Sequence, residues 1–478
     1  MQNKRDQVQS HMCAVGRLNA AIVSGDPDAP DPPMKRVTTG AVIGAVIGTL
    51  LVAGFGVYGL IRPGGSSDWR AEGALVSVKE SGARYVFLGG RLHPVANLAS
   101  GRLIAGREAK LASVHENTLK NTPRGFPVGI PGAPDALPGS SSLGGRDWMV
   151  CTTARTGSAG RTSDQVVVTM NVAAPKSAAG ADEGMLVRTS AGQTYLLWQG
   201  RRHRFTTAAG PFSLGYRGVV PYPVADQWIN MLPAGGDVAP PRVPGRGGAG
   251  PAIGDRPTRI GQVFTTENPG TVRQYFVLFA DGLRQVSVTV AGLVLGDPGT
   301  AAAYGGRTAG AVPVQSAAAA QHLSDAPAFT GGLPATPPRV RQAGGNDRPI
   351  CTSVLVDSAR GASVQVVVPA SGIPAGGIPV TDPDPRTAHT VLVRSGTGAL
   401  VRSLPAPGSG IGVRYLITDL GVKYPVPGDD DLSALGYAGV EPVPVPAAVL
   451  DLLPSGPPLA RAAAAGPAAA GSGRKGGS

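Results

Sequence analysis

The stretch LGYRGVVPYPV at residues 214–224 recurs without a gap as LGYAGVEPVPV at residues 435–445. The spacing between the two copies is 435 − 214 = 221 residues. The same register continues, so that MLPAG at 231–235 aligns with LLPSG at 452–456. Self-similarity of this length at one spacing indicates a structural module that is written twice in the chain.

Each copy of this stretch is preceded by a tyrosine that opens a short apolar run, a turn and a second run, which is typical of a β-hairpin. Four such hairpins begin at Tyr85, Tyr195, Tyr275 and Tyr415. A helix-like segment follows each of them, at Arg107–Lys120, Asp226–Leu232, Val314–Leu323 and Ala447–Leu453. We therefore predict four small ββα-like repeat units, which span residues 85–121, 195–235, 275–324 and 415–456.

Two further strands lie between the first and second units and recur between the third and fourth. The first copy holds Cys151 and the run QVVV at 165–168, and the second holds Cys351 and QVVV at 365–368, each 200 residues further on. Short Val-rich runs are consistent with buried strands. We expect residues 122–194 and 325–414 to form the two halves, A and B, of a central β domain.

The remaining segments are rich in Gly and Pro. The two copies meet in such a segment, and we expect a linker over residues 236–274. Residues 457–478 consist mostly of Ala, Gly, Pro and Ser, so that we expect a disordered tail there. Gly (70) and Pro (45) make up near a quarter of the 478 residues, which favours short elements and many turns.

The N-terminal part contains a candidate transmembrane helix. The twenty-five residues 37–61, between Arg36 and Arg62, carry no charge and are enough to span a bilayer. A core helix rarely lacks a polar stripe, and the apolar region of a cleaved signal peptide is shorter and nearer the N-terminus. Lys35 and Arg36 abut the helix, so the positive-inside rule places residues 1–36 in the cytoplasm and makes residues 62–84 the lead-in to an external domain.

Two helical faces in this part are candidate packing surfaces. Gly40, Gly44 and Gly48 recur every four residues, a spacing that lets membrane helices approach closely, although Gly is also common in membrane helices generally. In the tail, apolar residues recur at spacings of four, three, three and four, which predicts an amphipathic helix that ends at Gly25. Its apolar face, which would dock on a partner or on the membrane surface, consists of Val8, Met12, Val15, Leu18 and Ile22.

The three cysteines separate by predicted compartment. Cys13 precedes the membrane helix and lies in reducing cytoplasm, whereas Cys151 and Cys351 lie outside, where disulfides persist. The latter two occupy equivalent positions in the two copies, and equivalent strands of duplicated halves often pair about a pseudo-twofold axis. We therefore predict a disulfide between Cys151 and Cys351.

The chain is basic. Its formal net charge is +12, of which residues 1–36 contribute 5 − 4 = +1, so that +11 lies in the remainder. A domain of this charge attracts nucleic acid, anionic lipid headgroups or an acidic cell wall. An external location excludes nucleic acid as the partner.

No arrangement typical of an active site is present in the sequence. It contains no P-loop, no Gly-x-Ser-x-Gly elbow and no His-Glu-x-x-His pair, and its six His are scattered. His93 and His203 share a repeat position with Leu283 and Lys423, which we interpret as an exposed polar position on a hairpin. We interpret Asp429–Asp431 as a solvated loop. We predict no catalytic residue, no cofactor and no metal site.

The sequence resembles the EccB family, a single-pass core component of the type VII secretion machinery of actinobacteria and mycobacteria. Four features carry the resemblance. They are RDQVQSH at 5–11, the Gly25-Asp26-Pro27 sequence that ends the first helix, the lone membrane helix and the duplicated Cys-Thr module. It covers about residues 1–456 in order.

The resemblance implies an elongated periplasmic domain, with four repeat units like those of cell-wall-binding modules around a central β domain crossed by a disulfide. It also implies assembly with EccC, the motor ATPase, and with EccD and EccE, near the mycosin protease. Members of the family are sometimes labelled ATPases, a label for which this sequence offers no Walker motif.

The predicted fold class is therefore a single transmembrane helix followed by an elongated, β-rich α+β domain that is internally duplicated. The first functional reading is a structural membrane component that anchors and braces a type VII secretion channel on its periplasmic side. The alternatives are a nucleotide (ATP) hydrolase and a membrane-anchored cell-wall-binding protein. Repeats without a catalytic arrangement favour the first and the last, and the cytoplasmic helix favours the first. We expect an inner-membrane location, self-association of the periplasmic domains and contact with the cell wall.

Overall fold

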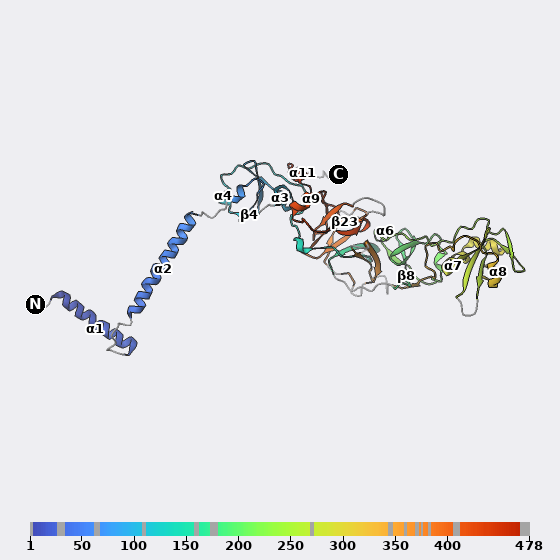
Figure 1. Ribbon diagram of the computed structural model, residues 1–478, viewed down its shortest axis with the longest axis horizontal. Helices are drawn as coiled ribbons and strands as arrows, with labels where there is room; N and C mark the ends of the chain where they lie inside the picture. The colour runs from blue at the N-terminus through green and yellow to red at the C-terminus, as the bar shows by residue number, and fades with distance from the viewer. Residues whose placement is uncertain are drawn as a thin grey trace.

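The protein has two long helices at its N-terminus and an elongated, β-rich body (Figure 1). A computed structural model describes residues 3–25, 34–61, 67–107, 111–156, 162–172, 180–267, 272–342, 348–357, 361–368, 372–373, 376–380, 384–404 and 412–468. Within these residues the strands form six sheets.

The two N-terminal helices match the sequence prediction. Helix α1 (Lys4–Ser24) ends at Gly25, which adopts the left-handed conformation (φ 69°) and donates its N–H to the Ala21 carbonyl oxygen at 3.1 Å. Helix α2 spans Met34–Ile61. Its segment Val37–Tyr58 has 22 residues and a mean hydropathy of 2.2, so it is long and apolar enough to cross a membrane. No other described part of the chain covers this segment.

Four of the sheets have the same strand order. In the first, β1 (Leu75–Val78) pairs antiparallel with β2 (Arg84–Leu88) and parallel with β4 (Leu111–Val114), and β3 (Arg91–Pro94) pairs with β2. The order β3-β2-β1-β4 recurs as β10-β9-β8-β11, β16-β15-β14-β17 and β25-β24-β23-β26. These strands are β8 (Glu183–Thr189), β9 (Thr194–Trp198), β10 (Arg201–Arg204), β11 (Tyr222–Val224), β14 (Val263–Thr266), β15 (Gln274–Phe279), β16 (Gly282–Val286), β17 (Val312–Pro313), β23 (Gly398–Leu404), β24 (Arg414–Ile417), β25 (Lys423–Pro425) and β26 (Val443–Pro446).

Each of these sheets is accompanied by helices at the same two places in the chain. One follows the third strand, and a short helix of 4 or 5 residues follows the fourth. The first sheet has α3 (Leu98–Ala105) and α4 (Glu116–Leu119), and the second has α5 (Gly210–Ser213) and α6 (Asp226–Asn230). The third has α7 (Val288–Leu295), extended by η3 (Pro298–Tyr304), and α8 (Ser316–Ala320). The fourth has α9 (Asp429–Leu435) and α10 (Ala447–Leu450). The segment Arg107–Lys120, interpreted as helical from sequence, holds strand β4 before its short helix.

Each sheet begins one strand before the unit that the sequence predicts. The tyrosine-led hairpins are the second and third strands, whereas the strand that joins the hairpin to the fourth strand precedes the tyrosine. Strands β1, β8, β14 and β23 fill this place. A two-stranded hairpin has a free edge on each side. The preceding strand pairs with the free edge of the hairpin's first strand, which is β2, β9, β15 or β24.

The central sheet has six strands in the order β20-β19-β6-β7-β22-β21. Its strands are β6 (Asp147–Thr156), β7 (Thr162–Met170), β19 (Ile350–Asp357), β20 (Gly361–Val367), β21 (Ile378–Pro379) and β22 (Thr390–Val393). The hairpins β6–β7 and β19–β20 meet through the antiparallel pair β6 and β19. Strand β22 adds to β7 in parallel.

The pairing of β6 with β19 is symmetric about the cysteines. Cys151 lies opposite Cys351, and Thr152 lies opposite Ile350. Adding 200 to 152 and subtracting it from 350 gives Thr352 opposite Val150, which is another pair of the same register. The register of β6 with β19 is thus symmetric about the two cysteines.

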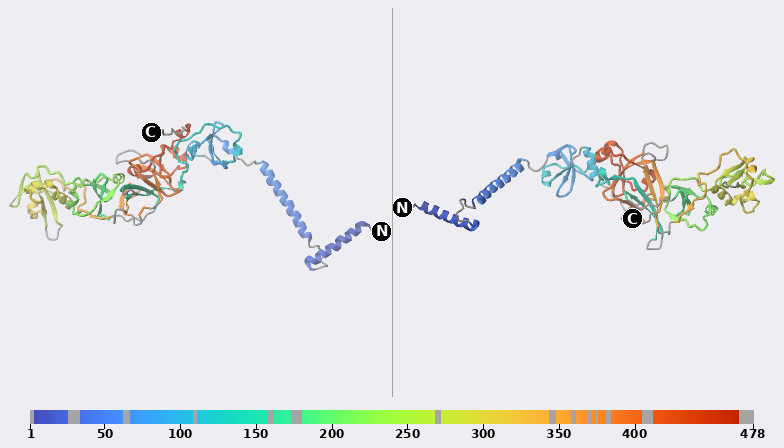
Figure 2. Two further views of the ribbon diagram at one scale, coloured as in Figure 1. Left: turned by 180° about the vertical axis from the view of Figure 1, so that it is seen from behind. Right: turned by 60° about the horizontal axis from the view of Figure 1, so that its bottom comes forward.

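Along the long axis the sheets follow the order first, fourth, central, second, third (Figures 1 and 2). Helix α3 of the first sheet packs on α9 of the fourth, and α5 of the second packs on α7 of the third. One buried core joins the first and fourth sheets, another joins the second and third, and a third core joins the central sheet to the second and fourth. The chain therefore crosses the centre of the molecule twice.

The two outermost sheets cover their outer faces with local elements. In the first sheet, Trp69 of η1 (Ser67–Arg70) packs into the core and meets Phe87 edge-on, with ring centroids 5.9 Å apart. In the third, Ile253 of the hairpin β12–β13 (Ala249–Ile253 and Arg256–Arg259) packs on Phe264 and Leu278. The described residues of the predicted linker, 236–267 and 272–274, therefore include three strands, β12, β13 and β14, and belong to the folded body.

The last described residues are also ordered, contrary to the predicted tail. Helix α11 (Arg461–Ala464) packs on α3, and Arg461 donates through Nε to the Leu103 carbonyl oxygen at 3.2 Å. Leu459 and Ala464 are fully buried in the core between the first and fourth sheets. Their burial holds this Ala- and Pro-rich segment against the two sheets. The part of the predicted tail at 469–478 lies outside the described residues.

Candidate functional site

The predicted disulfide lies in the middle of the central sheet. Cys151 and Cys351 are bonded, their Cα atoms are 3.9 Å apart, and both are fully buried. Met149 and Val367 pack beside them on one face of the sheet. The other face, which carries Val150, is covered by α6 and α10. The cysteine pair therefore joins the two halves at the centre of this symmetric register.

Each half also supplies a short strand to a sheet of the other half. Strand β5 (Leu143–Gly144), just before β6, pairs in parallel with β23 of the fourth sheet. Strand β18 (Arg339–Val340), just before β19, pairs in parallel with β8 of the second sheet. The halves are therefore interleaved.

The tyrosine of the repeated LGY stretch contributes to this interleaving. The hydroxyl of Tyr216 donates to the carbonyl oxygen of Pro338 at 3.0 Å, and the hydroxyl of Tyr437 donates to that of Pro138 at 2.8 Å. In each case the proline belongs to the other half, and the two prolines are 200 residues apart. Burial raises the pKa of both phenols, so that they remain donors.

One equivalent pair of threonines shows where the halves differ. Thr152 Oγ1 accepts the backbone N–H of Ala225 at 3.1 Å. Thr352 Oγ1 is buried and has no hydrogen-bond partner among the described residues. The residue equivalent to Ala225, 221 positions later, is Pro446, which has no N–H to donate.

A groove of about 690 Å³ lies beside α6 and α10, where the two halves meet. The first half contributes Asp164, Ser190, Asp226 and Asn230 to its walls. The second half contributes Arg386, His389 and Asp451. These side chains come from segments far apart in the sequence and belong to no repeated motif, so no sequence pattern predicts that they lie together.

Arg386, which lines the groove, and Lys423, which binds the lining residue Asp451, are both paired with carboxylates. Arg386 is bound to Asp384 at 2.9 Å, and the Nζ of Lys423 lies 3.7 Å from a carboxylate oxygen of Asp451. The Arg386 guanidinium holds the pKa of Asp384 at about 2. His389 accepts the Val166 N–H through Nδ1 at 3.1 Å, so the neutral ring carries its proton on Nε2.

Asp164 and Asp226 are the unpaired carboxylates of the groove. Asp226 accepts a hydrogen bond from the Ser190 hydroxyl at 3.2 Å, and neither carboxylate has a cationic partner among the described residues. Burial and the neighbouring charge of Asp226 raise the pKa of Asp164. The groove therefore carries negative charge on a protein of net charge +12.

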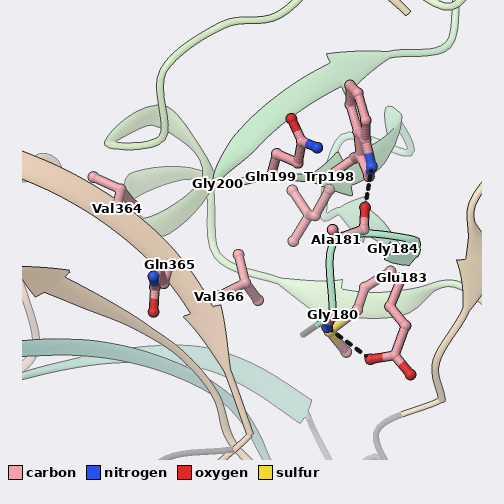
Figure 3. A pocket seen from close by; sticks show the side chains of 12 residues that line it. Gly180, Ala181, Glu183, Gly184, Trp198, Gln199, Gly200, Val364, Gln365 and Val366 are labelled. Atoms are coloured by element: carbon pink, nitrogen blue, oxygen red, sulfur yellow. Dashed lines mark hydrogen bonds between the residues drawn. The ribbon is translucent and has the colours of Figure 1, made fainter. Parts of the chain in front are cut away.

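A second cavity, of about 330 Å³, lies between the outer edge of β20 and the second sheet (Figure 3). Val364 and Val366 form one wall, and Trp198 lies on the other, where its Nε1 donates to the Ala181 carbonyl oxygen at 2.9 Å. Beside the cavity Gly200 touches β20, since a Cβ atom built there would lie 1.9 Å from the Val364 carbonyl oxygen. The cavity is thus a gap left where the second sheet abuts the central one.

The shared position of His93 and His203 is buried, so its interpretation as an exposed position is wrong. Their exposed fractions are 8% and 1%, and Leu283 and Lys423 are buried as well. Each His ring donates a hydrogen bond through Nδ1–H to a carbonyl oxygen of the loop after the short helix, that of Phe126 or Gly236, at 2.9 Å. Lys423 donates to the Leu450 carbonyl oxygen. At this position a histidine ties the loop to the sheet by a hydrogen bond, whereas Lys423 binds the last residue of the short helix α10.

Burial changes the acid–base properties of two of these residues. It lowers the pKa of His203, an effect that the hydrogen bond to the Gly236 carbonyl opposes. It also lowers the pKa of Lys423, while the nearby Asp451 acts in the opposite direction.

The carboxylates Asp429–Asp431 form the first turn of helix α9 and are not a solvated loop. Asp429 is exposed and bound to Arg414, whereas Asp431 is buried. Asp431 accepts the backbone N–H of Gly428 at 2.9 Å and that of Arg461 at 2.9 Å. Negative charge in a first turn stabilises a helix.

The predicted membrane and tail surfaces are unoccupied by the rest of the described chain. The side chains of the tail face are exposed; they are Val8, Met12, Val15, Leu18 and Ile22. No described atom lies within 4 Å of a Cβ built on Gly40, Gly44 or Gly48. Among the described residues, no three His, Cys, Asp or Glu side chains lie close enough together to hold a metal ion.

Residues 2–468 match the family described as "Type VII secretion system ESX-1, transport TM domain B", whose short name is EccB. The chain belongs to the EccB family. A curated relative named "ESX-3 secretion system ATPase EccB3", from Mycobacterium tuberculosis, is 29% identical over 96% of this chain and 88% of its own length.

Solved structures of ESX complexes also contain chains that resemble this one. The periplasmic assembly from the ESX-5 inner membrane complex contains a chain that is 26% identical, with a TM-score of 0.64 over 84% of this chain and 97% of that one. The EccB3 dimer from the ESX-3 core complex shares the fold, with a TM-score of 0.65 at 24% identity over 82% of this chain and all of that one. The fold is therefore that of EccB proteins.

Proposed function

We propose that this protein is a structural membrane component of a type VII secretion complex, which anchors and braces the channel on its periplasmic side. The observation that carries the proposal is the family match, which runs from before α1 to beyond α11 and includes the apolar helix α2. The interleaved, disulfide-joined body supports a bracing role, because an elongated body held at its centre resists bending.

We also propose that the N-terminus lies in the cytoplasm and the β-rich body outside. Lys35 and Arg36 precede the apolar helix, and the disulfide lies in the part that would face the oxidising side. A reporter fused after Ser478 that is active only outside the cytoplasm should then be active. Activity of a cytoplasm-specific reporter at the same position would reverse this orientation.

The duplication of the external domain remains part of the proposal. Two observations support it, namely the four sheets of one strand order and the reciprocal exchange of β5 and β18 between the halves. We propose that the four units are copies of one βββαβα module around the two cysteine hairpins.

The partners we propose are EccC-, EccD- and EccE-like membrane proteins and the mycosin protease, with self-association of the periplasmic domains and contact with the cell wall. The exposed apolar face of α1 is the surface that would dock on the cytoplasmic parts of the complex. The glycine stripe of α2 would pack against a partner helix, because the space beside it is open in this chain.

Assembly tests the proposed function directly. Replacing both Gly44 and Gly48 by Leu fills the stripe while keeping the helix apolar. We expect the variant to insert in the membrane but to co-purify with less of the secretion complex. The matched control replaces Val42 and Val46, on another face of α2, by Leu. Equal recovery of the complex with both variants and with the unchanged protein would mean that the glycines do not form a packing surface. If no secretion complex co-purifies with the unchanged protein, the proposed function is refuted.

The curated relatives carry the word ATPase in their names, which makes nucleotide hydrolysis the second candidate function. The groove beside α6 and α10 has the wrong charge for it, since a nucleotide is anionic and the unpaired groups there are carboxylates. No observation on the described residues favours hydrolysis.

A further inference from the structure

We propose that a basic cluster of the first unit, formed by Arg91, Lys120 and Arg124, binds the anionic phospholipid headgroups of the membrane into which α2 inserts. The proposal goes beyond a bracing role, because it gives the folded body its own contact with the lipid surface. It rests on the membrane anchor of the proposed function and holds for either orientation of α2.

The three cations of the cluster come from one edge of the first sheet. Strand β3, at that edge, pairs with the loop that follows α4 through a parallel bridge between Leu92 and Arg124. The bridge brings the main chain of Arg91, the residue before Leu92, next to that of Arg124. Lys120 lies at the C-terminal end of α4, four residues before Arg124. All three side chains are exposed.

The chain itself does not neutralise the cluster. None of its members has a carboxylate partner among the described residues, and the ion pairs of the first unit involve Arg84 and His115 instead. Arg124 lies over the Tyr85 ring, 5.5 Å from its centroid, an arrangement that leaves guanidinium N–H groups available to an anion. Residues 67–107 and 111–130 carry eight Lys and Arg against four Asp and Glu, a balance of 8 − 4 = +4.

The fold of the unit does not require these cations. The loop residue that bridges to the third strand is Arg124 in the first unit, and in the other three units it is Ala234, Leu323 or Ser455. The residue four positions earlier is Lys120 in the first unit, and in the others it is Asn230, Ala319 or Asp451. The same sheet, short helix and loop are therefore built three times without this pair of cations. The pair occurs in the unit that follows α2 in the chain.

The membrane is the anionic surface within reach of the first unit. Helix α2 ends at Ile61 and η1 starts at Ser67, which is 67 − 61 = 6 residues further on. Six steps of at most about 3.6 Å limit this connection to about 20 Å. The first sheet is accordingly the part of the body next to α2 (Figures 1 and 2). Anionic headgroups attract a basic cluster so close to the membrane, whereas a cell-wall polymer would have to extend to the membrane surface to meet it.

The cluster also has the composition of a surface that lies at a membrane interface. An Arg guanidinium matches the geometry of a phosphate and binds it through two N–H groups, and a Lys ammonium binds it as a point charge. Phe126, two residues after Arg124, is 57% exposed and meets the His93 ring edge-on. Exposed aromatic side chains beside cations are typical of segments that lie in the headgroup region. The combination fits a lipid surface better than a soluble anion, which gains nothing from Phe126.

The test uses the full chain in lipid vesicles, with a fluorescent dye attached beside the cluster. The exposed position Asn121 is changed by Asn121→Cys in a Cys13→Ser background. This provides one reactive thiol, because Cys151 and Cys351 are bonded to each other and buried. A lipid that carries a nitroxide on its headgroup quenches the dye on contact. We expect stronger quenching in vesicles of phosphatidylcholine with phosphatidylglycerol than in phosphatidylcholine alone. The difference should vanish near 1 M salt, where the screening length falls to about 3 Å.

The decisive variant removes the cluster by Arg91→Gln, Lys120→Gln and Arg124→Gln. Each cation favours an anionic surface by about fivefold, so the three together shift the balance between the docked and undocked states by on the order of a hundredfold. The dye on this variant should therefore be quenched equally in both kinds of vesicle. The matched control also removes three positive charges, at exposed positions farther along the body, and should behave as the unchanged protein. It carries Arg217→Gln, Arg242→Gln and Arg256→Gln.

Three outcomes would overturn the proposal. They are equal quenching of the unchanged protein in both kinds of vesicle, a lipid preference that survives the decisive variant, and a lipid preference that the control loses as well. A cluster that meets the cell wall instead of lipid predicts the first of these. Extraction of the unchanged protein from the vesicles at high pH would remove the anchor on which the proposal rests and would refute it too. An unchanged melting temperature shows that each variant is folded. Failure to co-purify a secretion complex would refute the proposed function and leave the lipid contact standing.

Discussion

At the scale of single residues, Gly200 decides how closely the second sheet approaches the centre of the molecule. It lies in the turn between β9 and β10 with φ 71°, and its backbone abuts the Val364 carbonyl oxygen. Both atoms that meet are main-chain atoms, so no side chain can rotate to make room. Any other residue must push the second sheet away from β20.

We therefore expect Gly200→Ala to destabilise the protein. A matched control exists in Gly192, which has φ 82° and no atom within 4 Å of a built Cβ. Both substitutions cost about 1–2 kcal/mol for a left-handed backbone, and only Gly200→Ala adds an overpacking cost of about 1–3 kcal/mol. Urea unfolding of the two purified variants, followed by tryptophan fluorescence, measures the difference. Equal midpoints would show that the turn moves without cost.

Some residues at this scale could be predicted from the sequence and others could not. The cysteines were predictable because they repeat in position and lie on one side of the apolar helix. The burial of His93 and His203 was not, because the four units place His, His, Leu and Lys there, and these differ in polarity. What they share is a place on the third strand beneath a returning loop, which is a tertiary feature. Asp164 and Asp226 could not be found either, since their partners in the groove come from distant segments.

At the scale of elements, the disulfide holds together the two strands on which the halves depend. It spans 200 residues of sequence between β6 and β19. In the chain-entropy model a crosslink over a loop of this size contributes about 5 kcal/mol by restricting the unfolded chain. Every strand of the second and third sheets lies inside that loop.

Cys151→Ser should accordingly lower the melting temperature markedly, whereas Cys13→Ser, at an exposed and free thiol in α1, should leave it unchanged. The measurement is thermal unfolding of both variants under non-reducing conditions. Mass spectrometry that finds Cys151 and Cys351 as free thiols in the native protein would contradict the premise.

The elements that the sequence predicts are those with a local signal. An apolar run, a turn and a second apolar run predict each tyrosine-led hairpin, and a continuous uncharged run predicts α2. The strand before each tyrosine, such as β1 or β8, was assigned to neighbouring segments because its pairing with β4 or β11 is parallel and nonlocal. In segment 236–274 Gly and Pro outnumber apolar residues, which predicts a linker, yet Ile253 and Thr258 of its hairpin are buried and Ile253 packs on the third sheet.

At the scale of the whole molecule, the word ATPase in the names of the curated relatives raises the question of whether this protein hydrolyses ATP. Hydrolysis requires backbone N–H groups around the phosphates, a cation on the transferring phosphoryl group and carboxylates that hold Mg²⁺. We expect the purified full chain to release phosphate no faster than a control protein of matched basic charge, because a net charge of +12 retains nucleotide only nonspecifically.

The measurement is steady-state phosphate release with Mg²⁺ on protein purified in high salt. The double variant Asp164→Asn, Asp226→Asn serves as an internal comparison, since it removes the unpaired carboxylates of the largest groove described here. Saturable turnover that survives the purification and disappears on a single carboxylate substitution would establish an enzyme.

The path of the chain through the molecule is the part of the fold that lay beyond the sequence. The repeats predict that the halves are equivalent, but equivalence does not say which sheets become neighbours. The order first, fourth, central, second, third follows from two nonlocal facts, the pairing of β6 with β19 and the packing of α3 on α9. Neither leaves a pattern in a single sequence.

The reciprocal exchange of β5 and β18 sets a limit on how early a newly made chain can become native. Strand β5 is synthesised 398 − 143 = 255 residues before the strand β23 that it joins, and β8 must wait for β18 in the same way. Neither half can therefore complete its sheets before the other half has been synthesised. Such late, long-range closure is slow and leaves apolar strand edges open meanwhile. A chain that ends after the second sheet therefore lacks β18 and β23, the strands that β8 and β5 join in the complete fold.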